Sequence, residues 1–206
     1  IKMRDQKMNL VETVGCRFGF RTIEVKDGVL TVNGTPVTLR GMQYSYFSYD
    51  ENGIPSKEQI RRDLQLMKQN NINAVRTVMY SPASNYFYEM CDEYGLYVVC
   101  DANLQPFSTQ TKAVATDKAY INLFISRMQN MYERLKNHPS IIAWSLGDGV
   151  DNGVCMENAF RAIKQKDKSR PVIFSGAGYS DNTDIVAHKN IEYDDNTNIL
   201  EKKYNL

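Results

Sequence analysis

Residues 141–149 read Ile141-Ile142-Ala143-Trp144-Ser145-Leu146-Gly147-Asp148-Gly149, and this stretch decides the fold. Its apolar run predicts a buried strand, and the glycines around the aspartate predict a sharp polar turn where that strand ends. A continuous apolar run is typical of a parallel strand that is covered on both faces. We therefore expect a helix-covered parallel sheet with polar groups at its carboxyl edge.

The segments on both sides of this stretch alternate between strand-like and helix-like patterns. Further strands are predicted at 37–41, 73–79, 97–102, 171–175 and 184–187, and helices at 84–94, 117–136 and 156–166. A further helix is predicted to begin at a capping box at 56–59, with Ile60, Leu64 and Met67 on one face. Strand-helix-strand units at this spacing form a parallel sheet. A (β/α)₈ TIM barrel needs eight strands and roughly 250 residues. The α/β pattern here, with about six strands, predicts an incomplete barrel. An open doubly wound sheet also satisfies the pattern, but no glycine-rich phosphate loop follows the first strand.

The ends of the chain differ from this alternating region. Residues 1–20 are polar without a helical period, residues 21–190 hold the predicted partial barrel, and residues 191–206 form a polar tail. Asp27-Gly28 and Asn33-Gly34 predict tight turns, because these residues tolerate a positive φ. Ser56 and Gly95 are predicted to cap helices, and Asn33-Gly34-Thr35 is better explained as a turn than as a glycosylation acceptor.

Composition narrows the class of protein. The chain has 206 residues, of which 42% are hydrophobic, and a formal net charge of +1. This charge gives no electrostatic argument for nucleic acid or a membrane surface as partner, and no apolar run approaches the roughly 20 residues of a membrane span. The four cysteines lie far apart and only two histidines are present, so zinc-ligand spacing is absent. We expect buried free thiols; Cys100 as a nucleophile is the alternative, although it has no evident base nearby.

The chain resembles glycoside hydrolase family 2, the family of β-galactosidases and β-glucuronidases, and within it the β-galactosidases most. The stretch 144–149 is similar to the signature Trp-Ser-Leu-Gly-Asn-Glu of the family's fourth strand. Further short matches follow in the family's order at 19–21, 32–34, 39–41, 62–63, 71–77, 91–98, 137–140 and 170–172. The resemblance implies a TIM barrel preceded by a β-sandwich domain, of which residues 1–20 would be the remnant.

At the catalytic positions the resemblance breaks. The last residue of the family signature is the general acid/base Glu, and its counterpart here is Gly149. The family's nucleophilic Glu lies on the seventh strand, beyond the strands expected in this chain. The magnesium ligands of the β-galactosidases correspond to Gln105, Phe107 and Gly149, which do not suit an ion that prefers carboxylates and water. We therefore expect no intact catalytic residue, no metal and no cofactor.

Two carboxylates remain at predicted strand ends. Retaining glycosidases use two carboxyl groups about 5 Å apart, one as nucleophile and one as acid/base. Asp101 and Asp148 are the candidates for a substitute pair or a weak metal site. The alternative for Asp148 is that it caps a turn, since its short side chain can bond the backbone.

Aromatic and amide side chains are also expected near the strand ends. The predicted substrate-binding residues are Tyr44, Tyr46, Tyr80, Asn103, Gln105, Phe107 and Trp144. Flat rings offer sugars an apolar face, and hydroxyl groups can hydrogen-bond to them. The same rings could instead fill a dead cleft as a plug.

These observations predict a barrel domain of carbohydrate metabolism that is inactive as a glycosidase and is retained as a sugar-binding or scaffold module. One alternative is a fragment of an active β-galactosidase-like enzyme that uses Asp148 or Asp101. Another is a structural or interaction module, because an open sheet edge is a ready pairing surface. The expected partners are a carbohydrate ligand, the remaining domains of a larger protein, and a second copy of the chain.

Overall fold

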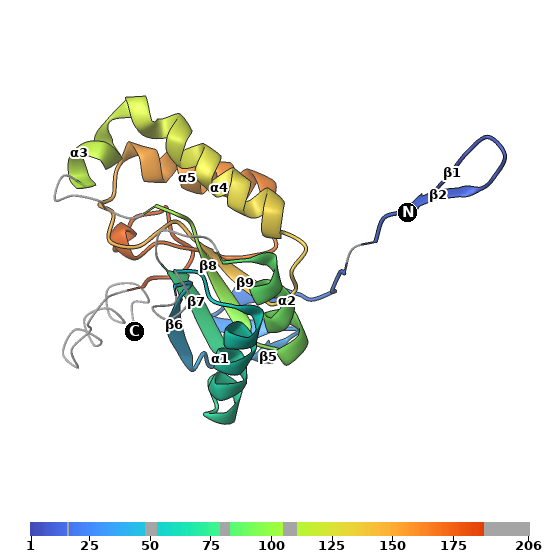
Figure 1. Cartoon of the computed structure of the whole chain (residues 1–206). Helices are drawn as coiled ribbons and strands as arrows, with labels where there is room; N and C mark the ends of the chain where they lie inside the picture. Colours follow the sequence, from blue (N-terminus) through green and yellow to red (C-terminus); the bar gives the residue numbers. More distant parts are fainter. Residues whose placement is uncertain (16, 48–52, 79–82, 105–110, 188–206) are drawn as a thin grey trace.

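A five-stranded parallel sheet forms the centre of the chain, as seen in the computed structural model (Figure 1). The structure describes residues 1–15, 17–47, 53–78, 83–104 and 111–187. The strands are β6 (Gly41–Ser45), β7 (Ala74–Val78), β8 (Tyr97–Asp101), β9 (Ile141–Ser145) and β10 (Val172–Ile173). They lie side by side in chain order, and a single parallel bridge between Ile173 and Ile185 extends the sheet beyond β10. The predicted incomplete barrel is thus confirmed, with its sixth strand reduced to one bridge.

Helices follow the strands and cover one side of the sheet (Figure 1). They are α1 (Lys57–Gln69), α2 (Asn85–Tyr94), α3 (Thr111–Thr116), α4 (Ile121–Leu135) and α5 (Val154–Lys166). Short 3₁₀ turns lie at η1 (Lys118–Tyr120) and η2 (Ser175–Ala177). α1 packs beside α2, and α4 beside α5. None of the helices in the described part of the chain is long and apolar enough to cross a membrane.

The predicted helix caps are confirmed. The Ser56 hydroxyl accepts a hydrogen bond from the Gln59 backbone N–H at 3.1 Å, which satisfies one of the free donors of the first turn of α1. Ser84, which was expected to be the first residue of the helix, instead caps α2 in the same way by accepting from the Phe87 N–H. Gly95 ends α2 in the left-handed conformation, with φ 63°.

The start of the first barrel strand differs from the prediction. A strand was expected at 37–41, but β6 begins at Gly41. The backbone before it is held largely by Asn73. Its side chain accepts from the Arg40 N–H at 2.7 Å and donates to the Thr38 carbonyl at 2.9 Å, and its backbone N–H donates to the Arg40 carbonyl at 3.0 Å. As a result Tyr44, expected after the strand, lies within it.

Two antiparallel units precede the sheet. β1 (Lys2–Arg4) and β2 (Leu10–Thr13) form a hairpin that lies apart from the rest of the chain in Figure 1. β3 (Ile23–Lys26), β4 (Val29–Val32) and β5 (Thr35–Pro36) form a second small sheet.

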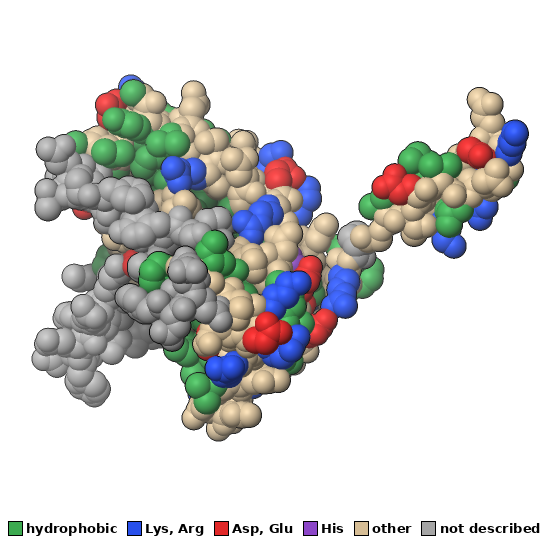
Figure 2. All heavy atoms as spheres, viewed as in Figure 1, with side chains coloured by type: hydrophobic (Ala, Val, Ile, Leu, Met, Phe, Trp, Pro, Cys, Tyr) green, Lys and Arg blue, Asp and Glu red, His purple; other side chains and the backbone are tan. Residues whose placement is uncertain are grey.

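The turns of this second sheet are the predicted ones. Asp27 and Gly28 have φ values of 50° and 76°, and Asn33 and Gly34 have values of 52° and 75°, so both pairs adopt the left-handed conformation. The origin of residues 1–20 as a sandwich remnant stays a prediction, and the predicted tail 191–206 lies outside the described residues. In Figure 2 basic and acidic side chains are interspersed over the visible surface, consistent with the net charge of +1.

The core lies between the sheet and its helices, and Trp144 is at its centre. The Trp144 indole N–H donates to Asp167 Oδ2 at 2.8 Å, and the Arg170 guanidinium lies 4.8 Å from the ring centre. Tyr132 of α4 meets the indole edge to face. Arg170 Nη1 in turn donates to Asp167 Oδ2 at 3.1 Å, and these two side chains are only 4% and 7% exposed. A buried ion pair therefore fixes the indole against α4 and α5.

The described cysteines behave as structural side chains. Cys91, Cys100 and Cys155 are free and buried. Burial raises the pKa of the Cys100 thiol to about 11, so the nucleophilic thiolate is scarce near neutral pH. The structure gives no support to Cys100 as a nucleophile.

Candidate functional site

A polar cluster forms at the carboxyl ends of the central strands. It consists of Arg76 on β7, Asp101 on β8, and Ser145 and Asp148 at the end of β9. Successive side chains of a strand point to opposite faces. Because Cys100 contacts Tyr88 of α2 and Trp144 contacts α4, their neighbours Asp101 and Ser145 face the other side, which is the barrel interior. Active sites of TIM barrels lie at this end of the strands.

One guanidinium links the members of this strand-end cluster. Arg76 Nη2 lies 3.3 and 3.2 Å from the two carboxylate oxygens of Asp101, 3.4 Å from Ser145 Oγ and 3.8 Å from Asp148 Oδ1. The Asp101 side chain is 3% exposed, whereas those of Asp148 and Arg76 are 20% and 25% exposed. A ligand at the strand ends would therefore meet Arg76 and Asp148, while Asp101 holds Arg76 from behind.

Burial dominates the electrostatics of Asp101. It raises the pKa of this carboxyl, and the neighbouring charge of Asp148 adds to the increase. The positive charge of Arg76 and the hydrogen bonds from Ser145 and Arg76 oppose it, but the net pKa remains above the ordinary value. The arrangement resembles a buried, neutralised ion pair more than a free acid/base.

The turns after β8 and β9 support each other through close backbone contact. Gly147 has φ 126°, and a Cβ atom at this position would lie 2.2 Å from the Leu104 carbonyl oxygen. The Asp148 N–H donates to the same carbonyl at 3.3 Å. Gly149, which the resemblance aligns with the family's acid/base Glu, has φ 70°, in the left-handed region that residues other than glycine rarely adopt.

The structure places two of the predicted sugar-binding aromatics away from this cluster. Trp144 is fully buried on the helix side of β9. The Tyr44 ring stacks on Phe87 of α2, and its hydroxyl donates to Asp63 of α1 at 3.0 Å. Both rings fill the layer between sheet and helices, so the expected aromatic lining of a strand-end pocket does not include them. The reason is the alternation of side chains along each strand.

The remaining predicted residues divide into two groups. Tyr46 is half-buried against the core, and Asn103 is half-buried after β8, where its carbonyl accepts from Arg127 at 2.9 Å. Tyr80, Gln105 and Phe107 lie outside the described residues. The choice between a sugar pocket and an aromatic plug therefore stays a prediction.

The sequence interpretation missed Arg76 and Ser145. Arg76 is the one charged residue within the apolar strand 74–78. An arginine inside such a strand is rarely buried unless it is paired. That signal could have identified it as the partner of carboxylates at neighbouring strand ends.

The magnesium ion implied by the resemblance does not fit the residues present. Gly149 offers no side-chain ligand, and the nearby carboxylates Asp101 and Asp148 already face the positive charge of Arg76. Across the described ranges no group of three or more His, Cys, Asp or Glu is placed to hold a metal ion.

The fold and this cluster define a segment of a (β/α)₈ barrel whose polar groups gather at the strand ends. Residues 23–205 match the family model for the TIM barrel domain of glycosyl hydrolases family 2, and the chain belongs to that family. It is a glycosidase-type domain of carbohydrate metabolism by descent.

Relatives and solved structures agree with this assignment. The chain is 39% identical over 185 residues to a beta-galactosidase of Priestia megaterium, covering 85% of this chain and 18% of the relative. It is 40% identical over 178 residues to a beta-galactosidase of Vibrio cholerae, covering 85% and 17%. Beta-glucuronidase 3 of Bacteroides uniformis shares the fold with a TM-score of 0.76 at 22% identity, covering 91% of this chain and 25% of that one. The chain thus spans less than a fifth of the length of these curated relatives.

The raised pKa of Asp101 predicts how stability changes with pH. Between its unfolded and folded pKa values the native state binds the proton more tightly, so this group opposes folding at higher pH and that penalty is relieved as the pH falls. Asp101→Asn cannot titrate and loses this relief. The unfolding free energy of the variant should therefore decline more steeply than that of the wild type on acidification.

Urea unfolding of both proteins at several pH values from neutral to acidic would measure this difference. Asp181→Asn, at an exposed carboxyl, is the matched control. The unfolding free energy of the wild type minus that of Asp101→Asn should increase as the pH falls. A value that stays constant or decreases would contradict the assignment.

Proposed function

We propose that this chain is a barrel segment of glycosyl hydrolases family 2 that lacks acid/base catalysis and retains carbohydrate binding at its strand ends. One observation carries the proposal: the acid/base position holds Gly149, in a left-handed backbone conformation with φ 70°. A glycosidase needs a carboxylic acid there to protonate the leaving oxygen. Loss of such a group typically lowers the rate by on the order of 10²–10⁴.

The remaining carboxylates are poor substitutes for the missing Glu. Asp101 is enclosed and bound by Arg76, so a substrate oxygen has little access to it. Asp148 stands one residue earlier than the family's Glu, about 3.8 Å away along the chain, and its side chain is one methylene shorter. These differences support an inactive site, because proton transfer requires hydrogen-bond contact with the leaving group.

The polar groups at the strand ends suit a sugar. Arg76 supplies N–H donors and Asp148 supplies acceptor oxygens, and both are partly exposed at the same edge of the sheet. A sugar hydroxyl both donates and accepts hydrogen bonds, so a neighbouring donor and acceptor can bind it from two sides. Since the relatives are beta-galactosidases, we infer a β-galactoside or a similar hexose as the ligand class.

Turnover and binding can be tested on the same sample of the 206-residue chain. We expect no hydrolysis of 4-nitrophenyl β-galactoside or β-glucuronide, and saturable binding of one of galactose, glucuronate, mannose and lactose by ligand-observed NMR. Asp148→Asn should weaken that binding about tenfold, the effect of losing one hydrogen bond to a charged group.

Asp151→Asn is the matched control, since this exposed carboxylate lies three residues further along the same loop. Hydrolysis that disappears in Asp148→Asn would overturn the inactive assignment and identify Asp148 as a substitute acid/base. A folded chain that binds none of the sugars would overturn retained binding and leave a scaffold role.

A further inference from the structure

A second site lies beside β8 on the helix-covered side of the sheet. Arg76 and the strand-end cluster lie on the other side, in the barrel interior. A cavity of about 220 Å³ opens on the helix-covered side between α4 and the end of β8. The lining residues that matter for its chemistry are Tyr88, Cys100, Asn103, Arg127, Asn130 and Arg134. None of them belongs to the strand-end cluster.

Two guanidinium groups in this cavity donate their hydrogen bonds within the described ranges to neutral acceptors. Arg127 Nη1 donates to the Asn103 carbonyl at 2.9 Å. Arg134 Nε donates to Asn85 Oδ1 at 3.1 Å, and its Nη2 donates to the Ala83 carbonyl. Neither arginine has an ion pair with any residue in the described ranges.

Among the described residues, the charged groups that line the cavity are therefore two guanidinium groups and one carboxyl group, so its net charge is positive. Asp101 also borders it, but the carboxylate oxygens of Asp101 are bound by Arg76 in the barrel interior. The positive charge of Arg134 also affects two residues that line the cavity, Tyr88 and Cys100. Burial raises the pKa of the Tyr88 hydroxyl and the Cys100 thiol, and the charge of Arg134 acts in the opposite direction on both, whereas the charge of Asp101 adds to the increase at Cys100.

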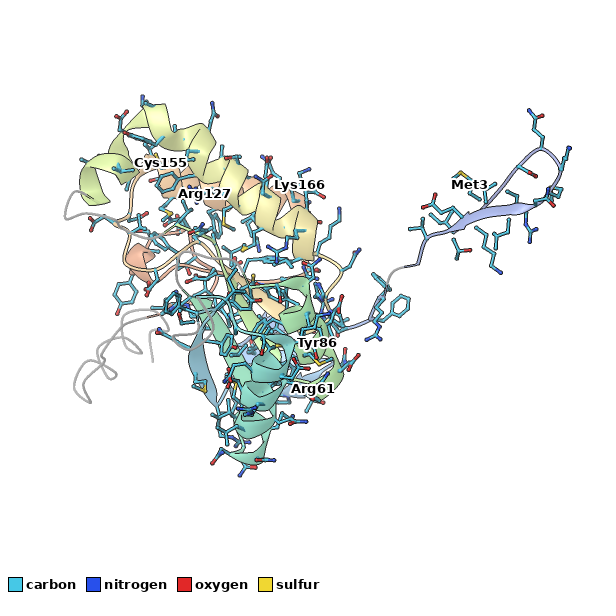
Figure 3. The ribbon with its side chains drawn as sticks, viewed as in Figure 1. Met3, Arg61, Tyr86, Arg127, Cys155 and Lys166 are labelled. Atoms are coloured by element: carbon cyan, nitrogen blue, oxygen red, sulfur yellow. The ribbon has the colours of Figure 1, made fainter. Side chains whose placement is uncertain are left out.

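The donors converge because of helical spacing. Arg127, Asn130 and Arg134 are separated by three and four residues, which places them on one face of α4. Figure 3 shows Arg127 on the side of this helix that faces the sheet. The planar fork of arginine matches the oxygens of phosphate and carboxylate groups.

From this geometry we propose that the cavity binds a small oxyanion, such as phosphate, sulfate or a short carboxylate, between Arg127 and Arg134. The volume supports a small ligand, because pockets for drug-sized molecules measure roughly 300–1,000 Å³. The site is independent of the proposed sugar binding at the strand ends. It would tie α4 to β8 when the anion is bound.

Titration of the full chain with inorganic phosphate, followed by calorimetry, tests the site. Chloride at equal ionic strength controls for screening, and acetate distinguishes a planar carboxylate from a tetrahedral anion. We expect saturable binding of phosphate or acetate, weakened about tenfold or more by Arg127→Gln and by Arg134→Gln. Arg161→Gln is the matched control, since this exposed arginine of α5 pairs only with Glu157 in the described structure.

A second measurement keeps the test valid if Arg134→Gln fails to fold, since that side chain also holds Ala83 and Asn85. Anion-dependent shifts of the Arg127 side-chain NMR signals would locate the ligand in the wild-type protein. Arg127→Lys, which keeps the charge, should retain part of the affinity. No saturable binding by the folded wild type, or unchanged affinity in Arg127→Gln, would overturn the proposal.

Discussion

Gly147→Ala should destabilise the chain by about 2–6 kcal/mol, a large part of the stability of a typical domain. Two costs act together. The φ of 126° is strained for any residue with a Cβ atom, at about 1–3 kcal/mol. The new methyl group would also lie 2.2 Å from the Leu104 carbonyl oxygen, so the turn after β8 must move, at a cost of about 1–3 kcal/mol. Urea unfolding followed by far-ultraviolet circular dichroism would measure the loss.

Gly178→Ala separates the two costs. Gly178 also has a positive φ, 56°, but a Cβ atom there would have no neighbour within 4 Å. Its substitution should cost about 1–3 kcal/mol, from the strained backbone conformation alone. Equal losses in the two variants would show that the Leu104 contact does not matter and that the two turns are not coupled.

Asp167→Asn should destabilise the chain by about 3–5 kcal/mol, because it leaves Arg170 buried without a counter-charge. Asn keeps the size of the side chain and one accepting oxygen, but its NH2 group would face donors that now bind the other carboxylate oxygen, so the loss includes hydrogen bonds as well as the charge. Burial already lowers the pKa of Arg170 to about 10, with the Asp167 charge opposing that decrease. Burial likewise acts to raise the pKa of Asp167, but hydrogen bonds from Ser169 and Trp144 and the charge of Arg170 outweigh it and lower the pKa.

The two charges of the pair therefore differ in their support. Several groups stabilise the ionised form of Asp167, whereas the protonated form of Arg170 depends on the charge of Asp167. Glu133→Gln is the control, because Glu133 pairs with Lys136 and Lys166 at the exposed surface. Exposed pairs contribute about 0–1 kcal/mol. If Asp167→Asn cost no more than Glu133→Gln in the same unfolding experiment, the buried pair would not be a main support of the core.

The architecture could be predicted because its signals are local. Apolar strands, helix caps at Ser56 and Gly95, and the turn glycines each depend on a few adjacent residues. The start of β6 could not be predicted in this way. It depends on the Asn73 side chain, which takes the hydrogen bonds of Thr38 and Arg40 from more than 30 positions away.

The site was predictable in part for a related reason. Parallel strands end at the same edge, so Asp101 and Asp148 could be expected together, and both lie beside Arg76. The direction of Trp144 could not be inferred. All residues of β9 are buried, so the strand lacks the alternation of apolar and polar residues that would indicate which side chains face the helices.

Trp144 also determines what intrinsic fluorescence reports in this protein. It is the only tryptophan beside 13 tyrosines, and its indole is enclosed by Tyr132, Asp167 and Arg170. Selective excitation of the indole therefore monitors the contact between β9 and the helices α4 and α5. The signal is a built-in probe of whether this half of the barrel wall is assembled, and a ligand at the strand ends would have to be detected by another label.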